Sequence, residues 1–253
     1  MLRKLLFVSM LIGITGFYRI SAQYDARKIK EIYGQLFRIE LLTHQIQTDF
    51  VLTGEQIMPA ESAEKKHRDE DAAKSALDSI LIAIPADDKD FLHDFLRIKK
   101  QMDIALSSVD SGYNTVTRKH SEKLFRRLRN HITLLQKKLL LLLSVSEQDL
   151  GLLDRIRQVN ENTEQAFRQY LVEGKKPGNL FKSAIKNLSK IRENFKKDKD
   201  LQFLITNMQS DLKTFDEAMK NGYKAGILYK PHEKFTRKIL RLFAHIYGKI
   251  KVV

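Results

Sequence analysis

Two pairs of residues in this sequence have a spacing that could serve metal chemistry on helices. Glu64 and His67 show the Glu-x-x-His spacing of di-iron helical bundles, and Asp90 and His93 are spaced in the same way. A di-iron centre needs two such motifs and two further glutamates that face one cavity. Glu64 and His67 fall in a predicted loop, and the residue 110 positions after His93 is Phe203. The sequence therefore predicts no metal site.

Other catalytic signatures are missing from the sequence. Glu40 and His44 lie one helical turn apart, which predicts a pair on the surface of a helix. There is no Gly-x-Ser-x-Gly nucleophile elbow, no phosphate-binding glycine loop and no His-Glu-x-x-His zinc motif. We expect a protein that is not an enzyme and needs no cofactor. The alternative is an enzyme whose site is assembled from ordinary residues inside a helical bundle.

The C-terminal segment from His232 to Val253 alternates basic and apolar residues, and Glu233 is its only acid. Basic amphipathic helices of this kind can lie on anionic membrane surfaces. A bundle helix with a solvated basic face is the competing interpretation, and the repeat described below favours it. The candidate contacts with a membrane or another polyanion are Lys234, Arg237, Lys238, Arg241, Lys249 and Lys251.

Two further patterns have both a structural and a functional interpretation. Leu139 to Leu143 is apolar on every side of a helix, which predicts burial between two packed units or, alternatively, a surface for a partner. Gly112-Tyr113 and Gly222-Tyr223 predict helix ends followed by an aromatic side chain that packs back on the bundle. In the alternative interpretation, the two tyrosines frame a ligand site.

The elements that must position these residues fall into two similar stretches. Asp88-Lys89-Asp90 and Gly112-Tyr113 recur 110 residues later as Asp198-Lys199-Asp200 and Gly222-Tyr223. Six apolar positions at helical spacing match at the same offset, which predicts an internal repeat. These pairs are Phe91 with Leu201, Phe95 with Ile205, Ile98 with Met208, Met102 with Leu212, Ala105 with Phe215 and Val109 with Met219.

Apolar residues three and four positions apart predict an all-α protein built as two tandem, related bundles of about four helices each. The expected helices cover residues 24–53, 66–84, the stretch between Asp88 and Gly112, 117–145, 148–172, 180–195, 199–220 and the C-terminal segment. The bundles would span residues 24–147 and 148–253. The join at residues 144–148 has no proline or glycine. We therefore expect that the fourth helix can continue into the fifth without a break, which would give an elongated rod.

The N-terminal residues 1–23 are typical of a secretory signal peptide. Arg3 and Lys4 precede an apolar run from Leu5 to Phe17, and a cut is expected after Ala22 or Gln23. An uncleaved membrane anchor is the alternative, although the run is shorter than the roughly 20 residues that span a bilayer. The chain has no cysteine, so it carries neither disulfides nor a lipid-modified cysteine. We expect a periplasmic or secreted bacterial protein.

The remaining chain is basic. Without Arg3, Lys4 and Arg19 it holds 42 basic and 31 acidic residues, a net charge near +11. Such a surface attracts anionic lipid or acidic polymers. The layout resembles the extracytoplasmic four-helix sensing modules of bacterial histidine kinases and chemoreceptors, which implies a sensor-like ligand-binding module.

From the sequence we expect an exported, non-catalytic helical-bundle protein that binds a macromolecular partner or a small ligand in the bacterial envelope. Another protein is the favoured partner, and nucleic acid is not favoured. The alternatives are a membrane-surface or polyanion-associated protein that uses its basic amphipathic helices, and the sensor-like module.

Overall fold

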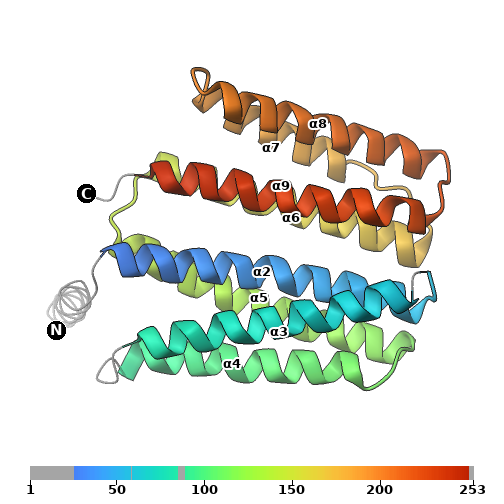
Figure 1. Ribbon diagram of the computed structural model, residues 1–253, viewed down its shortest axis with the longest axis horizontal. Coiled ribbons are helices and arrows are strands. Elements are labelled where there is room, and N and C mark those ends of the chain that lie inside the picture. The colour runs from blue at the N-terminus through green and yellow to red at the C-terminus, as the bar shows by residue number, and fades with distance from the viewer. Residues whose placement is uncertain (1–25, 58, 85–88, 251–253) are drawn as a thin grey trace, which may run out of the picture.

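The computed structural model describes residues 26–57, 59–84 and 89–250, and all regular structure in these ranges is helical (Figure 1). The all-α prediction is therefore confirmed. Eight helices are found in the described residues: α2 (Ala26–Gly54), α3 (Pro59–Ala83), α4 (Lys89–Asp110), α5 (Thr115–Leu142), α6 (Glu147–Glu173), α7 (Leu180–Asn194), α8 (Lys199–Lys220) and α9 (Ala225–Lys249).

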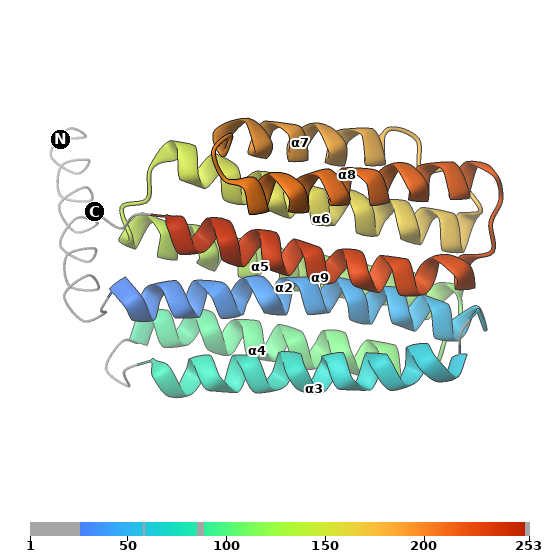
Figure 2. The same ribbon diagram turned by 45° about the horizontal axis from the view of Figure 1, so that its top comes forward.

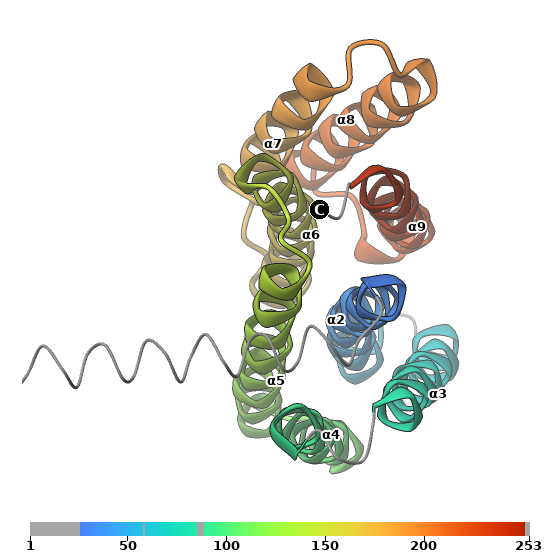
Figure 3. The ribbon, with the colours of Figure 1, turned by 90° about the vertical axis from the view of Figure 1, so that its left-hand side faces the viewer.

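The helices lie roughly parallel or antiparallel to one another in two layers (Figures 2 and 3). One layer contains α4, α5, α6 and α7, and the other contains α3, α2, α9 and α8. We call α2 to α5 the first half and α6 to α9 the second half. Helix α2 contacts α3 and α5 of its own half and also α6 and α9 of the second half. The two halves are therefore packed side by side, with α2 near the centre.

The apolar stripes predicted from the sequence form the core. All twelve residues of the six matched pairs on α4 and α8 are at most 4% exposed, and they belong to one hydrophobic cluster that runs through both halves. The leucine run behaves as predicted on its inner side, because Leu139, Leu140 and Leu143 are buried. Leu141 points outward and is 60% exposed, since one residue in every helical turn must leave the packed face.

The continuous helix expected across the join does not form. Helix α5 ends at Leu142, and Ser144 adopts a left-handed conformation with φ 48°. Ser146 then begins α6 by accepting a hydrogen bond from the backbone N–H of Asp149 at 3.2 Å. The reversal turns α6 back alongside the first half (Figure 2), so that the halves do not form a single rod.

Two helices begin earlier than their sequences predicted. Helix α3 starts at Pro59, where a proline is well tolerated because the first helical N–H has no partner within the helix. The predicted loop that contains Glu64 and His67 is therefore helical. Helix α9 starts at Ala225 and contains Pro231, although the helix was expected to begin after this proline. The predicted signal segment (residues 1–23), Asp88 and Lys251 lie outside the described residues.

The glycine–tyrosine pairs end their helices as predicted, with φ 90° at Gly112 and 72° at Gly222. Tyr113 packs back on the end of α2, where its ring covers Gly54 and meets Phe50 at 5.2 Å between ring centroids. Its hydroxyl donates to Glu55 Oε1 at 2.5 Å. Tyr223 differs, because its side chain is 50% exposed. The structural interpretation is confirmed for Tyr113 and wrong for Tyr223.

Candidate functional site

The polar side of α2 is buried, and this is the main departure from the sequence prediction. Glu40 and His44, expected as a surface pair, are 2% and 3% exposed. Gln47, Thr48 and Asp49 on the same helix are equally buried. The reason is tertiary, because α6 and α9 of the second half cover the face that a lone bundle would leave in water. Charged groups in such a place must find partners.

Glu40 is paired with an arginine from the second half. Arg157 on α6 donates from Nε to Glu40 Oε1 at 2.9 Å and from Nη2 to Gln136 Oε1 at 2.5 Å. Burial raises the pKa of Glu40, and the Arg157 guanidinium partly opposes this effect. Arg157 also lies 3.7 Å from Asp154 Oδ1. Arg157 thus links three helices, α2, α5 and α6.

Glu164 forms the second link between the halves. It accepts a hydrogen bond from the Thr48 hydroxyl on α2 at 2.9 Å, and His232 Nε2 on α9 lies 3.0 Å from its other oxygen. Arg168 Nη1 is 3.9 Å away. Burial alone would raise the pKa of Glu164, but His232, Arg168 and the Thr48 hydrogen bond outweigh it and lower the pKa to about 2. Glu164 is therefore a buried carboxylate that stays ionised.

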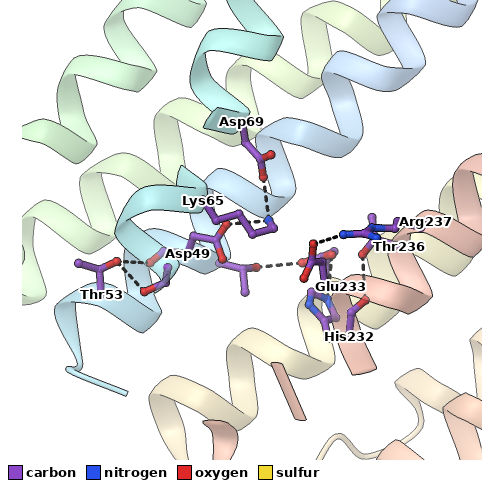
Figure 4. Close-up of polar contacts among 11 residues, drawn as sticks. Asp49, Thr53, Lys65, Asp69, His232, Glu233, Thr236 and Arg237 are labelled. Carbon is purple, nitrogen blue, oxygen red and sulfur yellow. Dashed lines mark hydrogen bonds and ion pairs between the residues drawn. The ribbon is translucent and has the colours of Figure 1, made fainter. Parts of the chain in front are cut away.

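Asp49 forms a third cluster with α3 (Figure 4). Lys65 Nζ donates to Asp49 Oδ2 at 2.9 Å and to Asp69 Oδ2 at 2.8 Å. Burial raises the pKa of Asp49 to about 6, and Lys65 only partly offsets that effect. Figure 4 places this cluster close to the start of α9, where Glu233 accepts from Arg237 at 2.5 Å.

His44 is held in its neutral form between arginines. Arg168 Nη1 lies 3.4 Å from His44 Nδ1, and Arg129 donates to the neighbouring Gln47 Oε1 at 3.1 Å. Burial, and then the positive charges of Arg129 and Arg168, lower the pKa of His44 well below its usual range. His44 is thus a neutral imidazole at 3% exposure inside the packed interface between the halves.

A groove opens to solvent at one end of this interface. It has a volume of about 490 Å³ and is bordered by α2, α5 and α6. Four leucines form its apolar walls, and Gly151 leaves space on one side. Arg157 and Asp154 mark the side that adjoins the buried polar cluster. The complete lining is Tyr33, Lys137, Leu140, Leu141, Leu150, Gly151, Leu153, Asp154 and Arg157.

The groove combines features that suit a small amphipathic ligand. Volumes of roughly 300 to 1,000 Å³ with apolar walls and a few polar groups are usual for ligand sites. Lys137 is exposed and forms no ion pair with any residue that the structure describes, so its ammonium is available to an anion. Tyr33 lies buried at the floor and stacks on Tyr247 at 5.0 Å between ring centroids. The floor is consequently aromatic.

Glu64 and His67, the first pair considered for metal binding, lie on the exposed side of α3. The Glu64 and His67 side chains are 75% and 65% exposed on α3, and His67 Nδ1 instead lies 3.2 Å from Glu70. Across residues 26–57, 59–84 and 89–250, no three potential ligand side chains come together as a metal site would require. In the same residues no helix is both long and apolar enough to cross a membrane.

The basic residues singled out on α9 are divided by their surroundings. Arg237, Lys238 and Lys249 are engaged with Glu233, Asp211 and Asp198. Lys234 and Arg241 are exposed, and no ion pair joins either of them to another described residue. The apolar face of α9 is buried in the core, including Phe235, Ile239 and Phe243. Helix α9 thus offers cations to the surface, while its apolar face is buried and Ile227, near its start, is exposed.

The groove residues were missed by the sequence prediction, although one signal for the interface was present. Residues 39–54 of α2 contain neither lysine nor arginine, in a chain that has 45 of them. A helix face turned toward water would normally carry several. Comparisons with protein-family models, with curated proteins and with solved structures give no match for this chain. The function must therefore be argued from the site itself.

Proposed function

We propose that this protein is an exported, non-catalytic helical binding protein of the bacterial envelope whose ligand occupies the groove between α2, α5 and α6. The observation that carries the proposal is the groove of about 490 Å³ with four leucines and one unpaired cation, Lys137. We infer an amphipathic ligand of modest size, with an apolar body along the leucines and a carboxylate or phosphate at Lys137.

The neighbouring polar residues support binding rather than catalysis. Arg157 is already committed to Glu40, Gln136 and Asp154, so it orients the wall of the groove and leaves Lys137 as the group that attracts an anion. A nucleophile with an adjacent base is the usual mark of covalent catalysis. Among the residues that line this groove there is no serine, histidine, cysteine or threonine.

The proposal includes an origin by duplication of a four-helix unit, with residues 24–147 and 148–253 as the two copies. Helices α4 and α8 are both 22 residues long and begin 110 residues apart, at Lys89 and Lys199. Helices α5 and α9 also begin 110 residues apart. The order of helix contacts within each half is similar, and these correspondences support the repeat. The groove would then be a feature that arose where two copies meet.

The experiment is a titration with 8-anilinonaphthalene-1-sulfonate, an anionic aromatic amphiphile whose fluorescence rises in apolar sites, followed by displacement with laurate. The test variant is Gly151→Leu, which fills the groove from a position where an added Cβ meets nothing within 4 Å. Gly248→Leu is the matched control, because Gly248 is also helical with open space around it and lies outside the groove.

We expect saturable binding to the wild type, a loss of roughly tenfold or more in the Gly151→Leu variant and no change in the control. Equal binding by wild type and the Gly151→Leu variant, with both folded by circular dichroism, would contradict a site in this groove.

A further inference from the structure

We propose that the outer ridge of α5 is a docking surface for an anionic phospholipid membrane. The ridge is the solvent-facing strip of α5 between Lys123 and Leu141, about 27 Å long at 1.5 Å per residue. Figure 3 shows α5 at the outer edge of the molecule, between α4 and α6. The ridge consists of the exposed residues Lys123, Arg126, Arg127, Asn130, Leu134, Lys137, Lys138 and Leu141.

The ridge joins positive charge with exposed leucines. It contains five basic residues and no acid, while Leu134 and Leu141 are 58% and 60% exposed. Within the described part of the chain, Lys138 is the only ridge cation in an ion pair, with Asp94 of α4. On the opposite side of the ridge, α6 carries Asp154, which already interacts with Arg157 and accepts a hydrogen bond from Gln158. The ridge therefore presents nearly all of its charge to the solvent.

The leucines distinguish a membrane from other polyanions. Basic residues alone would suit an acidic glycan or a nucleic acid, but binding to either of these would not remove the two exposed leucines from water. Anionic lipid offers both phosphates for the cations and an apolar boundary for the leucines. A second copy of this chain is disfavoured, because two identical ridges would bring like charges together.

A groove beside the ridge adds apolar surface that a lipid could use. It lies between α4 and α5, has a volume of about 370 Å³ and contains Ile98, Leu134 and Leu135 together with the basic residues Arg97 and Lys138. Burial, then the charges of Arg97 and Arg127, lower the pKa of His131 in its wall. The groove thus has an apolar interior and a rim that is basic on balance, because Arg97, Lys137 and Lys138 outnumber Asp94, the one acid in its lining. A lipid presents its chain and head group in the same order.

Helix α9 provides the contrast. Its outward residues Lys230, Lys234, Arg237 and Arg241 are basic, and Ile227, which is 60% exposed, lies one helical turn before them. Part of the positive charge of this helix is offset by acids: Glu233 pairs with Arg237, Asp211 with Lys238 and Asp198 with Lys249. Helix α5 thus presents more unpaired basic charge beside exposed apolar side chains than α9 does.

The experiment is co-sedimentation of the full mature chain with vesicles of equal parts dioleoyl phosphatidylglycerol and dioleoyl phosphatidylcholine, at 50 mM and 300 mM salt. Pure phosphatidylcholine vesicles serve as the neutral control. The test variants are Lys123→Gln with Arg127→Gln, and Leu134→Ser, none of which touches the groove proposed for the ligand. The matched controls on the other half are Lys234→Gln with Arg241→Gln, and Phe203→Ser, whose phenylalanine is 70% exposed.

We expect binding only to the anionic vesicles and a steep weakening at 300 mM salt. The double neutralisation should lower the affinity about 25-fold, at about fivefold for each basic residue near the surface. Leu134→Ser should lower it by about fivefold, because the leucine is partly exposed and its apolar area would enter the lipid. The α9 and α8 controls should bind like the wild type.

Three outcomes overturn the proposal: no binding to anionic vesicles, an equal loss in the α9 control, or a loss on charge removal without any effect of Leu134→Ser. The last result would indicate a surface for polyanions in general. Binding of 8-anilinonaphthalene-1-sulfonate to the same variants separates this proposal from the ligand groove. Lys137 and Leu141 belong to both surfaces, so the variants avoid them. Failure of the groove would appear as unchanged binding of 8-anilinonaphthalene-1-sulfonate by Gly151→Leu, and failure of the ridge as unchanged vesicle binding by Lys123→Gln with Arg127→Gln and by Leu134→Ser.

Discussion

Replacing Glu164 with glutamine should weaken the contact between the two halves by about 3 kcal/mol at neutral pH. Glutamine keeps the shape of the side chain and an oxygen for the Thr48 hydroxyl, but it removes the negative charge that faces His232 and Arg168. The pKa of this carboxyl falls from 4.5 to about 2 in the folded protein. A difference of about 2.5 units at 1.36 kcal/mol per unit gives the magnitude.

The pH dependence of this loss has a definite sign. Because the pKa of Glu164 is lower in the folded protein than in the unfolded chain, its stabilising contribution is complete above pH 4.5 and disappears as the pH falls toward 2. The wild type and the Glu164→Gln variant should therefore differ by about 3 kcal/mol at pH 7, by about half as much at pH 3 and very little at pH 2.

Urea unfolding followed by circular dichroism at 222 nm measures the free energy of unfolding at each pH. Asp78→Asn is the control, since Asp78 pairs with Lys99 on the surface and its side chain is 54% exposed. That variant should lose less than about 1 kcal/mol. A loss below about 1 kcal/mol for Glu164→Gln at pH 7, or the same loss at pH 3 as at pH 7, would refute the assignment of Glu164 as an ionised link between the halves.

Other residues give predictions that the same unfolding assay can check. Burial raises the pKa of Asp49 from 3.8 to about 6, so its contribution to stability is present below pH 3.8 and lost as the pH rises through 6. In the Asp49→Asn variant, the free energy of unfolding should vary by up to about 3 kcal/mol less between pH 4 and 7 than in the wild type. The same pH profile in both proteins would contradict the raised pKa of Asp49. Gly54→Ala should destabilise by about 1–3 kcal/mol, because its Cβ would lie 1.9 Å from the Tyr113 ring. Gly34→Ala, with nothing within 4 Å, should instead stabilise by about 0.5–1 kcal/mol, and equal effects at the two glycines would be inconsistent with this packing. Asn114→Ala should cost about 1 kcal/mol, because Asn114 accepts hydrogen bonds from two backbone N–H groups at the start of α5; an unchanged stability would show that this cap contributes little.

The helical class and most of the core could be predicted because they depend on local periodicity. Phe91 and Phe95 on α4, and Leu201 and Ile205 on α8, face the core because residues three and four apart share one side of a helix. Gly112 and Gly222 end their helices because a left-handed conformation suits glycine. These features need no knowledge of which helices pack together.

The polar interface could not be predicted in the same way. Glu40 and His44 are polar residues that lie beside the apolar stripe of α2, and local sequence therefore assigns them to water. Their partners Arg157 and Arg168 come from α6, 117 and 124 residues further along the chain. Only the packing of the second half on α2 makes that face interior. The groove results from the same packing, so it could not be predicted from the local sequence either.

The turn between the halves was missed for a local reason. Ser144 has no side-chain feature that demands a left-handed conformation, and neither proline nor glycine lies nearby. With Ser144 in this conformation, the two halves pack side by side and Leu143 is buried in their shared core. Ser146 was the one legible signal, because serine is a favoured residue at the start of a helix.

The proposal that the groove is the binding site is tested most directly by hydrogen–deuterium exchange of the protein with and without laurate. Exchange reports local opening of the backbone, and a ligand that binds the folded form slows it where it contacts the protein. We predict slower exchange in peptides that cover the end of α5 and the start of α6, residues 137–157, and no change in α8. Unchanged exchange at saturating laurate, or slowing only in α8 or α9, would contradict a ligand site between α2, α5 and α6.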